Sequence, residues 1–247
     1  MTEPGRTRGP IVDELPATGD VLFRWRSYMP LALVPLFVLS LSDDRPPTPF
    51  GFEVACFAIA LSGLCLRAFV IGTAPEGTSA RGTTRPTADH LNTSGAYSIV
   101  RHPLYVANTL MWLGCSLLSG TWSLPAIVAL LSVIYHERIA AREEAFLQNT
   151  FGDQFLAWTA RVPAMLPSFA NYRPSGVPFQ TRRVFMQEAH GLFAVGTAFL
   201  VLDTLEDSVR LRTFHVDSRW LAVFVATLIP FLFVVIAKNA PRMNSKI

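Results

Sequence analysis

The chain has 247 residues, of which 51% are hydrophobic and only 16% are charged. Soluble domains usually carry about 25% charged residues, so this composition favours a membrane protein over a soluble one. The net charge of +3 is small, and the arginines are scattered along the chain rather than gathered in a stripe, which argues against nucleic acid as a partner.

Six apolar segments are expected to form helices in the membrane. A helix needs about 20 apolar residues to cross the hydrocarbon of a bilayer. The segments lie at about 27–41, 50–71, 104–118, 121–135, 184–202 and 220–237. The third and fourth are short, and only Ser119 and Gly120 separate them, which predicts a tight helical hairpin.

Two polar stretches, 73–101 and 136–183, interrupt the apolar segments. The first is rich in Gly, Thr, Ser, Pro and Asn, which is typical of a loop. The second begins with residues 136–150, which lack helix breakers, so the fourth helix is expected to continue into water. Gly152 then stands where a C-terminal helix cap belongs. These features predict an all-α integral membrane protein with about six transmembrane helices, a short hairpin and a cytoplasmic helical catalytic segment.

The basic residues are unevenly distributed about these six segments. With a cytoplasmic N-terminus, seventeen of the 21 Lys and Arg residues fall on the cytoplasmic side. The positive-inside rule therefore predicts that both termini and both polar stretches face the cytoplasm. We expect an N-terminal arm at 1–26, a membrane core at 27–183 and a C-terminal helix pair at 184–247.

The densest polar cluster lies just before the third apolar segment. Pro103 suits the first turn of a helix, which puts Arg101 and His102 at the mouth of that helix. The free N–H groups and the positive dipole end there favour a carboxylate or phosphate. Tyr105 and Asn108 follow on one helix face. From these residues alone, a membrane-interface belt that anchors lipid headgroups is an equally good interpretation.

Two further clusters follow in the second polar stretch. Glu143 and Glu144 lie on the predicted helical extension, where an inward carboxylate could hold an ammonium group or ribose hydroxyls; ordinary charges on a solvated helix are the alternative. Phe155, Trp158 and Arg161 precede two prolines, and the alternative to a functional role for them is an amphipathic interfacial helix that ends at proline.

Together these motifs resemble the isoprenylcysteine carboxyl methyltransferase and phospholipid methyltransferase superfamily. The resemblance covers about residues 73–167. It rests on the order and spacing of Gly95, Tyr97, Arg101, His102, Pro103, Tyr105, Glu143, Glu144, Leu147, Phe151, Gly152, Phe155, Arg161 and Pro163. The stretches 78–83 and 89–95 further resemble a bacterial subgroup that includes the lipid A phosphate methyltransferase. Ala107 and Phe155 depart from the family pattern, in which a glycine and a tyrosine are usual.

The resemblance implies S-adenosylmethionine as cofactor, a lipid or lipid-linked acceptor, and a place in a bacterial inner membrane. It implies a cofactor site made of Tyr97, Val100, Arg101, His102, Tyr105, Asn108, Glu143 and Glu144. In that site Arg101 and His102 would hold the carboxylate end of the cofactor, and the two glutamates would engage its amino or ribose groups. The implied catalytic residues are Arg161, which would face the acceptor's anionic group, Glu143 and Arg101.

The chemistry of methyl transfer narrows the chemical class of the acceptor. A sulfonium methyl group is already activated, so an anionic oxygen can accept it without a strong base, and alignment is the main task. Arginines outnumber candidate bases around the motif, which favours a phosphate or carboxylate. A lipid amine would need a base, for which Glu143 or Glu144 is the candidate. No metal is expected, because His136-Glu137 lacks the second histidine of a zinc-protease motif.

Two other function classes stay open. A membrane reductase of the sterol-reductase type, using NADPH, has a related helical layout, although the Glu-Glu-x-x-Leu element argues against it. A non-enzymatic transporter is the other, because Glu53, Glu188 and His190 within apolar segments can mark an ion path. Their positions near helix ends favour side chains that reach out to the interface instead.

Overall fold

The computed structural model describes residues 19, 21–25, 28–41, 46–75, 77–78 and 89–239. Every regular element in this part of the chain is a helix, which confirms the all-α prediction. The predicted N-terminal arm and the 78–83 motif lie largely outside the described residues.

Six apolar helices correspond to the six predicted segments. They are α2 (Leu33–Ser40), α3 (Phe50–Thr73), α4 (Pro103–Leu117), α5 (Ser123–Phe151), α7 (Thr181–Leu211) and α8 (Ser218–Asn239). Four of them, α3, α5, α7 and α8, are long and apolar enough to cross a membrane. With 8 and 15 residues, α2 and α4 fall short of the length that a full crossing needs. The predicted number of apolar helices is therefore met, whereas only four have full spanning length.

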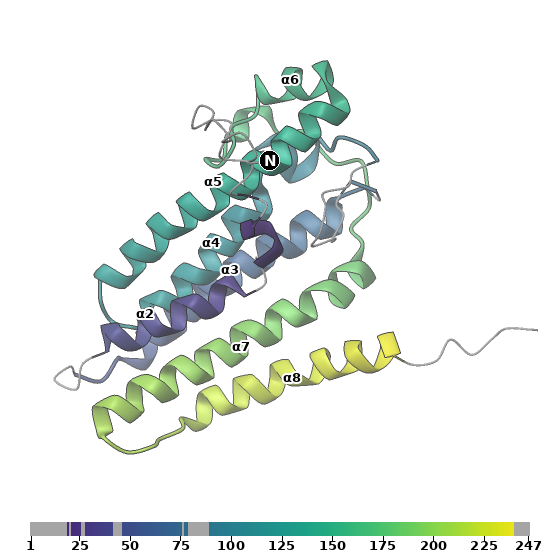
Figure 1. Ribbon diagram of the computed structural model, residues 1–247. Coiled ribbons are helices and arrows are strands. Elements are labelled where there is room, and N and C mark those ends of the chain that lie inside the picture. Colours follow the sequence, from purple (N-terminus) through teal and green to yellow (C-terminus); the bar gives the residue numbers. More distant parts are fainter. Residues whose placement is uncertain are drawn as a thin grey trace, which may run out of the picture.

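The helices lie roughly along one direction. Figure 1 shows α3, α4 and α5 side by side, with α7 and α8 forming an antiparallel hairpin along the α3 side. The short helix α2, preceded by the 3-10 turn η1 (Met29–Ala32), contacts α5 and α7 near the start of α5 and the second half of α7. The bundle thus has one end where α4 begins and α5 ends, and we call this the motif end.

Small residues bring α3 and α4 into close contact. A Cβ atom added at Gly63 would lie 2.4 Å from the carbonyl oxygen of Ala107, and one added at Gly114 would lie 2.6 Å from the backbone nitrogen of Ala60. Such close backbone approach is typical of packed membrane helices. It leaves Ala107 fully buried and fixes the first turn of α4 against α3.

The two helix boundaries expected near the motifs are confirmed. Pro103 is the first residue of α4, and His102 is its N-cap. α5 continues to Phe151 and ends at Gly152, whose φ of +49° suits a residue without a Cβ atom. The chain then turns into the short helix α6 (Asp153–Thr159). Glu143 and Glu144 therefore lie in the last turns of a long helix, beside the start of α4.

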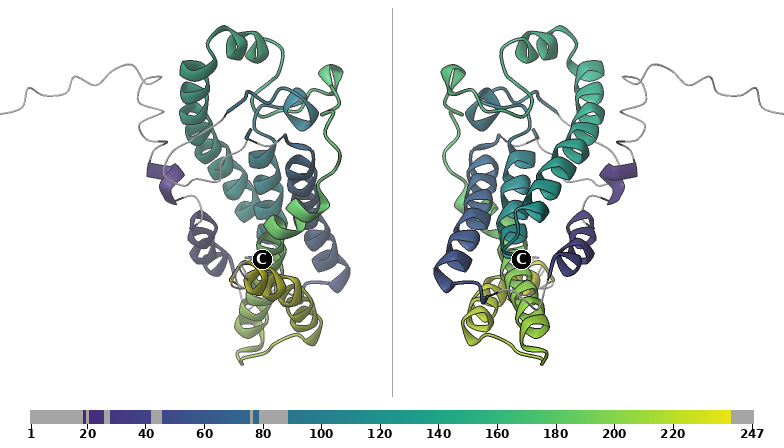
Figure 2. Two further views of the ribbon diagram at one scale, coloured as in Figure 1. Left: turned by 90° about the vertical axis from the view of Figure 1, so that its right-hand side faces the viewer. Right: turned by 90° about the vertical axis from the view of Figure 1, so that its left-hand side faces the viewer.

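Residues 89–102 and 152–180 together cover the motif end, and we call them the cap (Figure 2). Backbone hydrogen bonds join the two segments. Arg101 N–H donates to the oxygen of Pro163 at 2.9 Å, and Gly95 N–H donates to that of Arg173 at 2.8 Å. The indole N–H of Trp158 also donates to the oxygen of Tyr97 at 3.0 Å. Motif residues some 60 positions apart thus form one structure.

Candidate functional site

Four charged side chains meet where the cap joins α4 and α5, and we call them the charged site. Arg101 Nη1 donates to Glu144 Oε2 at 2.9 Å. His102 Nε2 lies 2.8 Å from Glu144 Oε1, and His102 Nδ1 lies 3.7 Å from Glu143 Oε2. The structure therefore brings together the Arg-His and Glu-Glu motifs, which lie about 40 positions apart in the sequence.

The charged site is only partly closed. The Glu143 and Glu144 side chains keep 26% and 24% of their exposure, whereas that of His102 keeps 5%. Nε of Arg101 is buried and has no hydrogen-bond partner among the described residues. The site thus presents carboxylate oxygens and a guanidinium N–H that are still able to bind a further group.

The surroundings shift two pKa values at this end of the molecule. Burial alone would lower the pKa of His102, but its contacts with the Glu143 and Glu144 carboxylates outweigh burial and raise it. Burial and the charge of Glu143 raise the pKa of Tyr97. His102 is therefore stabilised as a cation between two carboxylates, and Tyr97 keeps its proton.

Aromatic rings continue from the charged site along the α4–α5 contact. The ring of Tyr105 stacks on His102 at 5.4 Å and on His136 at 4.9 Å, and His136 stacks on Trp112 at 5.1 Å. We call His102, Tyr105, His136 and Trp112 the ring column. Tyr105 therefore lies at the predicted site, and its ring holds His102 against the glutamates.

Two of the predicted cofactor residues, Val100 and Asn108, lie outside both the charged site and the ring column. Val100 is buried in the cap, where its backbone supports the turn before Arg101. Asn108 lies deeper in the bundle, and its side-chain oxygen accepts a hydrogen bond from Arg67 at 2.7 Å. The structure therefore assigns Asn108 a partner within the protein, away from the charged site.

Arg67, Asn108 and Glu188 form a second polar cluster, which we call the buried triad. Arg67 Nε and Nη2 donate to the two carboxylate oxygens of Glu188 at 2.8 and 3.0 Å. The Glu188 side chain keeps 7% of its exposure. The interpretation of Glu188 as reaching out to the interface is wrong, because it pairs with Arg67 inside the bundle. The sequence signal was Arg67 itself, a charge within an apolar run that needs a partner.

Glu53 is a second correction. It is buried, with 6% exposure, and it accepts a hydrogen bond from the indole N–H of Trp220 at 2.9 Å. It therefore links α3 to α8 instead of extending to the interface. His190 is exposed and packs edge-on against Phe231 at 5.2 Å.

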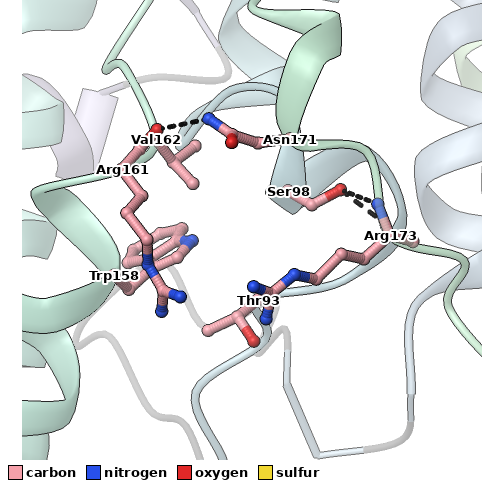
Figure 3. Close-up of a pocket in the computed structure, with 7 residues that line it drawn as sticks. All are labelled: Thr93, Ser98, Trp158, Arg161, Val162, Asn171 and Arg173. Atoms are coloured by element: carbon pink, nitrogen blue, oxygen red, sulfur yellow. Dashed lines mark hydrogen bonds between the residues drawn. The ribbon is translucent and has the colours of Figure 1, made fainter.

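Arg161 lies in a pocket of the cap, apart from the charged site. Figure 3 shows the Arg161 and Arg173 side chains pointing toward each other across this pocket, with Thr93 between them. Trp158 forms its wall, and Asn171 fixes the rim by donating to the oxygen of Arg161 at 2.8 Å. Two guanidinium groups that converge in this way suit an anion. Sequence reasoning missed Arg173, because it lies beyond the recognised motifs.

The arrangement as a whole suits binding and alignment. The charged site offers both a cationic and an anionic side, and the cap pocket offers a second cationic surface. Among the residues that the structure describes, no group of three or more His, Cys, Asp or Glu side chains is arranged to hold a metal ion.

Comparisons with known proteins give the family context. The phospholipid methyltransferase family matches residues 53–154, which include most of α3, all of α4 and α5, and the four residues of the charged site. No solved structure matches the chain.

Three curated proteins are similar to parts of the chain. The cobalt-zinc-cadmium resistance protein CzcN of Cupriavidus metallidurans is 36% identical over 34% of this chain and 38% of its own length. The nickel-cobalt-cadmium resistance protein NccN of Alcaligenes xylosoxydans xylosoxydans is 28% identical over 55% of this chain and 60% of its own length. The protein-S-isoprenylcysteine O-methyltransferase of Schizosaccharomyces pombe is 27% identical over 47% of this chain and 50% of its own length.

The chain thus spans less than two thirds of each of these relatives. The family match contains both the Arg-His and the Glu-Glu motif. The yeast relative is an isoprenylcysteine methyltransferase, the other family that the motifs resemble. The chain is therefore a helical membrane protein that is similar to the phospholipid methyltransferase family over residues 53–154, and to an isoprenylcysteine O-methyltransferase over about half of its length.

Proposed function

We propose that this protein transfers a methyl group from S-adenosylmethionine to an anionic oxygen of a lipid or lipid-linked headgroup. The observation that carries the proposal is the charged site, in which Arg101 and His102 meet Glu143 and Glu144 within 4 Å. The match to a methyltransferase family favours this reaction over the reductase and transporter alternatives.

The charged site fits the amino-acid end of S-adenosylmethionine, which carries an ammonium and a carboxylate. The buried, unpartnered Nε of Arg101 is a donor for the carboxylate. The partly exposed oxygens of Glu143 and Glu144 are acceptors for the ammonium. Two cations and two carboxylates leave the site nearly neutral, which suits a zwitterion better than a purely anionic ligand. Tyr97, on the cap side, and Tyr105 would line the cofactor.

The residues would act mainly by alignment. When bound, the cofactor supplies a methyl group on a positively charged sulfur, which an anionic oxygen can accept without releasing a proton. Arg101 and Glu143 would hold the donor in place, and the cap would exclude water from the reacting atoms. Positioning of this kind can contribute several kcal/mol, on the order of 7 or more in favourable cases.

Fewer observations bear on the methyl acceptor than on the cofactor. Arg161 and Arg173 converge in the cap pocket, which supports a phosphate or carboxylate headgroup. The yeast relative's name records methylation at oxygen, in agreement with an oxygen acceptor here. The distribution of Lys and Arg supports a cytoplasmic site with both termini on that side, and the resemblance of residues 89–95 to a bacterial subgroup supports a bacterial inner membrane.

The test is methyl transfer by the purified protein. The protein in detergent is mixed with radiolabelled S-adenosylmethionine and a total lipid extract, and the labelled lipid is identified. We expect a labelled lipid, and its loss in Glu144→Gln. Glu137→Gln is the matched control, because Glu137 lies two turns earlier on α5 and is exposed. Absence of cofactor binding in the unmodified protein, or equal activity of Glu144→Gln and the control, would overturn the proposal.

A further inference from the structure

Two buried polar atoms on α5 have no hydrogen-bond partner in the part of the chain that the structure describes. Ser132 and His136 follow each other by one helical turn, with 0% and 2% exposure. Oγ of Ser132 and Nε2 of His136 form no hydrogen bond with any described residue. Both residues belong to the buried face of α5, which continues toward Glu143.

The hydrogen bonds around His136 fix which ring nitrogen carries the proton. The Thr109 hydroxyl donates its only hydrogen to the backbone oxygen of Tyr105 at 2.9 Å. It also lies 3.3 Å from Nδ1 of His136, so in that contact the hydroxyl oxygen accepts and Nδ1–H donates. In the neutral ring Nε2 is then a bare lone pair.

A lone pair buried inside a membrane protein is costly. Withdrawing a polar group from water without a hydrogen bond costs about 1–3 kcal/mol by mutational measures, and lipid supplies no substitute partner. Buried polar groups without partners therefore point to a water molecule or a ligand that completes them.

His136 is also close to the proposed methyl-donor site. It lies seven residues before Glu143 on α5, which is about 10 Å along the helix axis. Only the ring of Tyr105 separates it from His102, with centroid distances of 4.9 and 5.4 Å. His136 therefore forms the next layer of the ring column, on the side of the charged site that faces into the bundle.

We propose that Nε2 of His136 binds an O–H or N–H group of the methyl acceptor, with the Ser132 hydroxyl as the next polar contact below it. A lone pair attracts a donor and repels an anionic oxygen, so this group is separate from the oxygen that receives the methyl. The acceptor class is then a lipid headgroup that carries a hydroxyl or amine in addition to its anionic oxygen. This inference rests on the proposed function.

Two matched anionic lipids test it as competitors for labelling of the lipid extract. Phosphatidylglycerol and phosphatidylmethanol share the phosphodiester charge, but only the first carries headgroup hydroxyls. We expect phosphatidylglycerol to inhibit labelling at about one-tenth of the concentration that phosphatidylmethanol requires, as one hydrogen bond predicts. Equal inhibition by the two lipids, or no inhibition by either, would overturn the inference and leave the proposed function intact. Absence of labelling without competitor would overturn both.

A pair of variants locates the effect at Nε2. In His136→Asn the amide nitrogen can still donate to Thr109, but no atom occupies the position of Nε2. In His136→Gln the amide oxygen approaches that position. We expect the preference for phosphatidylglycerol to vanish in the first variant and to persist in the second, with cofactor affinity unchanged in both. A preference retained in a folded His136→Asn protein would contradict the assignment. Where that variant does not fold, the lipid comparison in the unmodified protein decides.

Discussion

The charged site and the buried triad are both built from arginine and glutamate near the motif end, but they differ in completeness. In the buried triad Arg67 uses Nε and both terminal nitrogens on protein oxygens, and Glu188 is almost fully enclosed. In the charged site Nε of Arg101 has no partner in the described chain, and both carboxylates are about one quarter exposed.

This difference in hydrogen bonding distinguishes a stabilising cluster from a binding site better than residue type does. A complete set of hydrogen bonds inside a bundle leaves nothing for a ligand and stabilises the contact between helices. An incomplete set at an open position leaves donors and acceptors that a ligand can use. The buried triad is therefore expected to act on stability, and the charged site on binding.

The largest expected effect is the loss of protein stability when the buried triad is broken. Arg67→Met leaves the Glu188 carboxylate buried without its partner, which we expect to lower the free energy of unfolding by about 3–5 kcal/mol. Denaturant unfolding in detergent measures the loss. The double variant Arg67→Met, Glu188→Met is the control, and it should recover most of the loss because both charges are gone. A cost below about 1 kcal/mol for the single variant would show that the pair contributes little.

In the charged site we expect a substitution to affect cofactor affinity more than stability. Glu144→Gln removes the carboxylate that joins Arg101 and His102. We expect cofactor affinity to fall by about 100-fold, equivalent to about 2.7 kcal/mol, with a smaller change in the unfolding midpoint. Isothermal titration with S-adenosylmethionine measures the affinity, and Glu137→Gln again serves as control. If Glu144→Gln destabilised the protein as much as Arg67→Met, the contrast between the two clusters would fail.

Much of this organisation is predictable from the sequence. Hydrophobic runs predict the apolar helices, because lipid forces the backbone to satisfy its own hydrogen bonds within a helix. Pro103 and Gly152 predict the two boundaries that place the motifs, since each has a local conformational preference. The spacing of the Arg-His and Glu-Glu motifs predicts their meeting only through resemblance to a family.

The interior pairings are the part that the sequence does not reveal. Which helix faces another depends on packing, such as the close approach at Gly63 and Gly114, and no local pattern encodes it. The resemblance implies a cofactor role for Asn108, whereas its side-chain oxygen accepts a hydrogen bond from Arg67 on α3. Glu53 likewise finds Trp220 167 positions away.

The pH dependence sharpens the comparison, because only the charged site contains a histidine. The carboxylates of Glu143 and Glu144 raise the pKa of His102 above its ordinary value of 6.5. Its protonation then stabilises the folded state fully below that ordinary value, and this contribution is lost as the pH rises through the raised pKa. We expect the unfolding midpoint of the unmodified protein to fall as the pH rises above about 6.5, the ordinary pKa of histidine. Thermal unfolding of His102→Gln should lack this decline, and a decline of equal size would assign it to another group.

The smallest expected effect decides the role of Asn108. Its oxygen accepts one hydrogen bond from Arg67 at 2.7 Å, while two bonds from Arg67 to Glu188 remain without it. Asn108→Ala should therefore lower the free energy of unfolding by only about 1 kcal/mol, the scale of one polar contact between membrane helices. Cofactor affinity should stay unchanged, because the residue belongs to the complete cluster. A tenfold loss of affinity with unchanged stability would instead move Asn108 to the charged site, and the boundary between the two clusters would have to be redrawn.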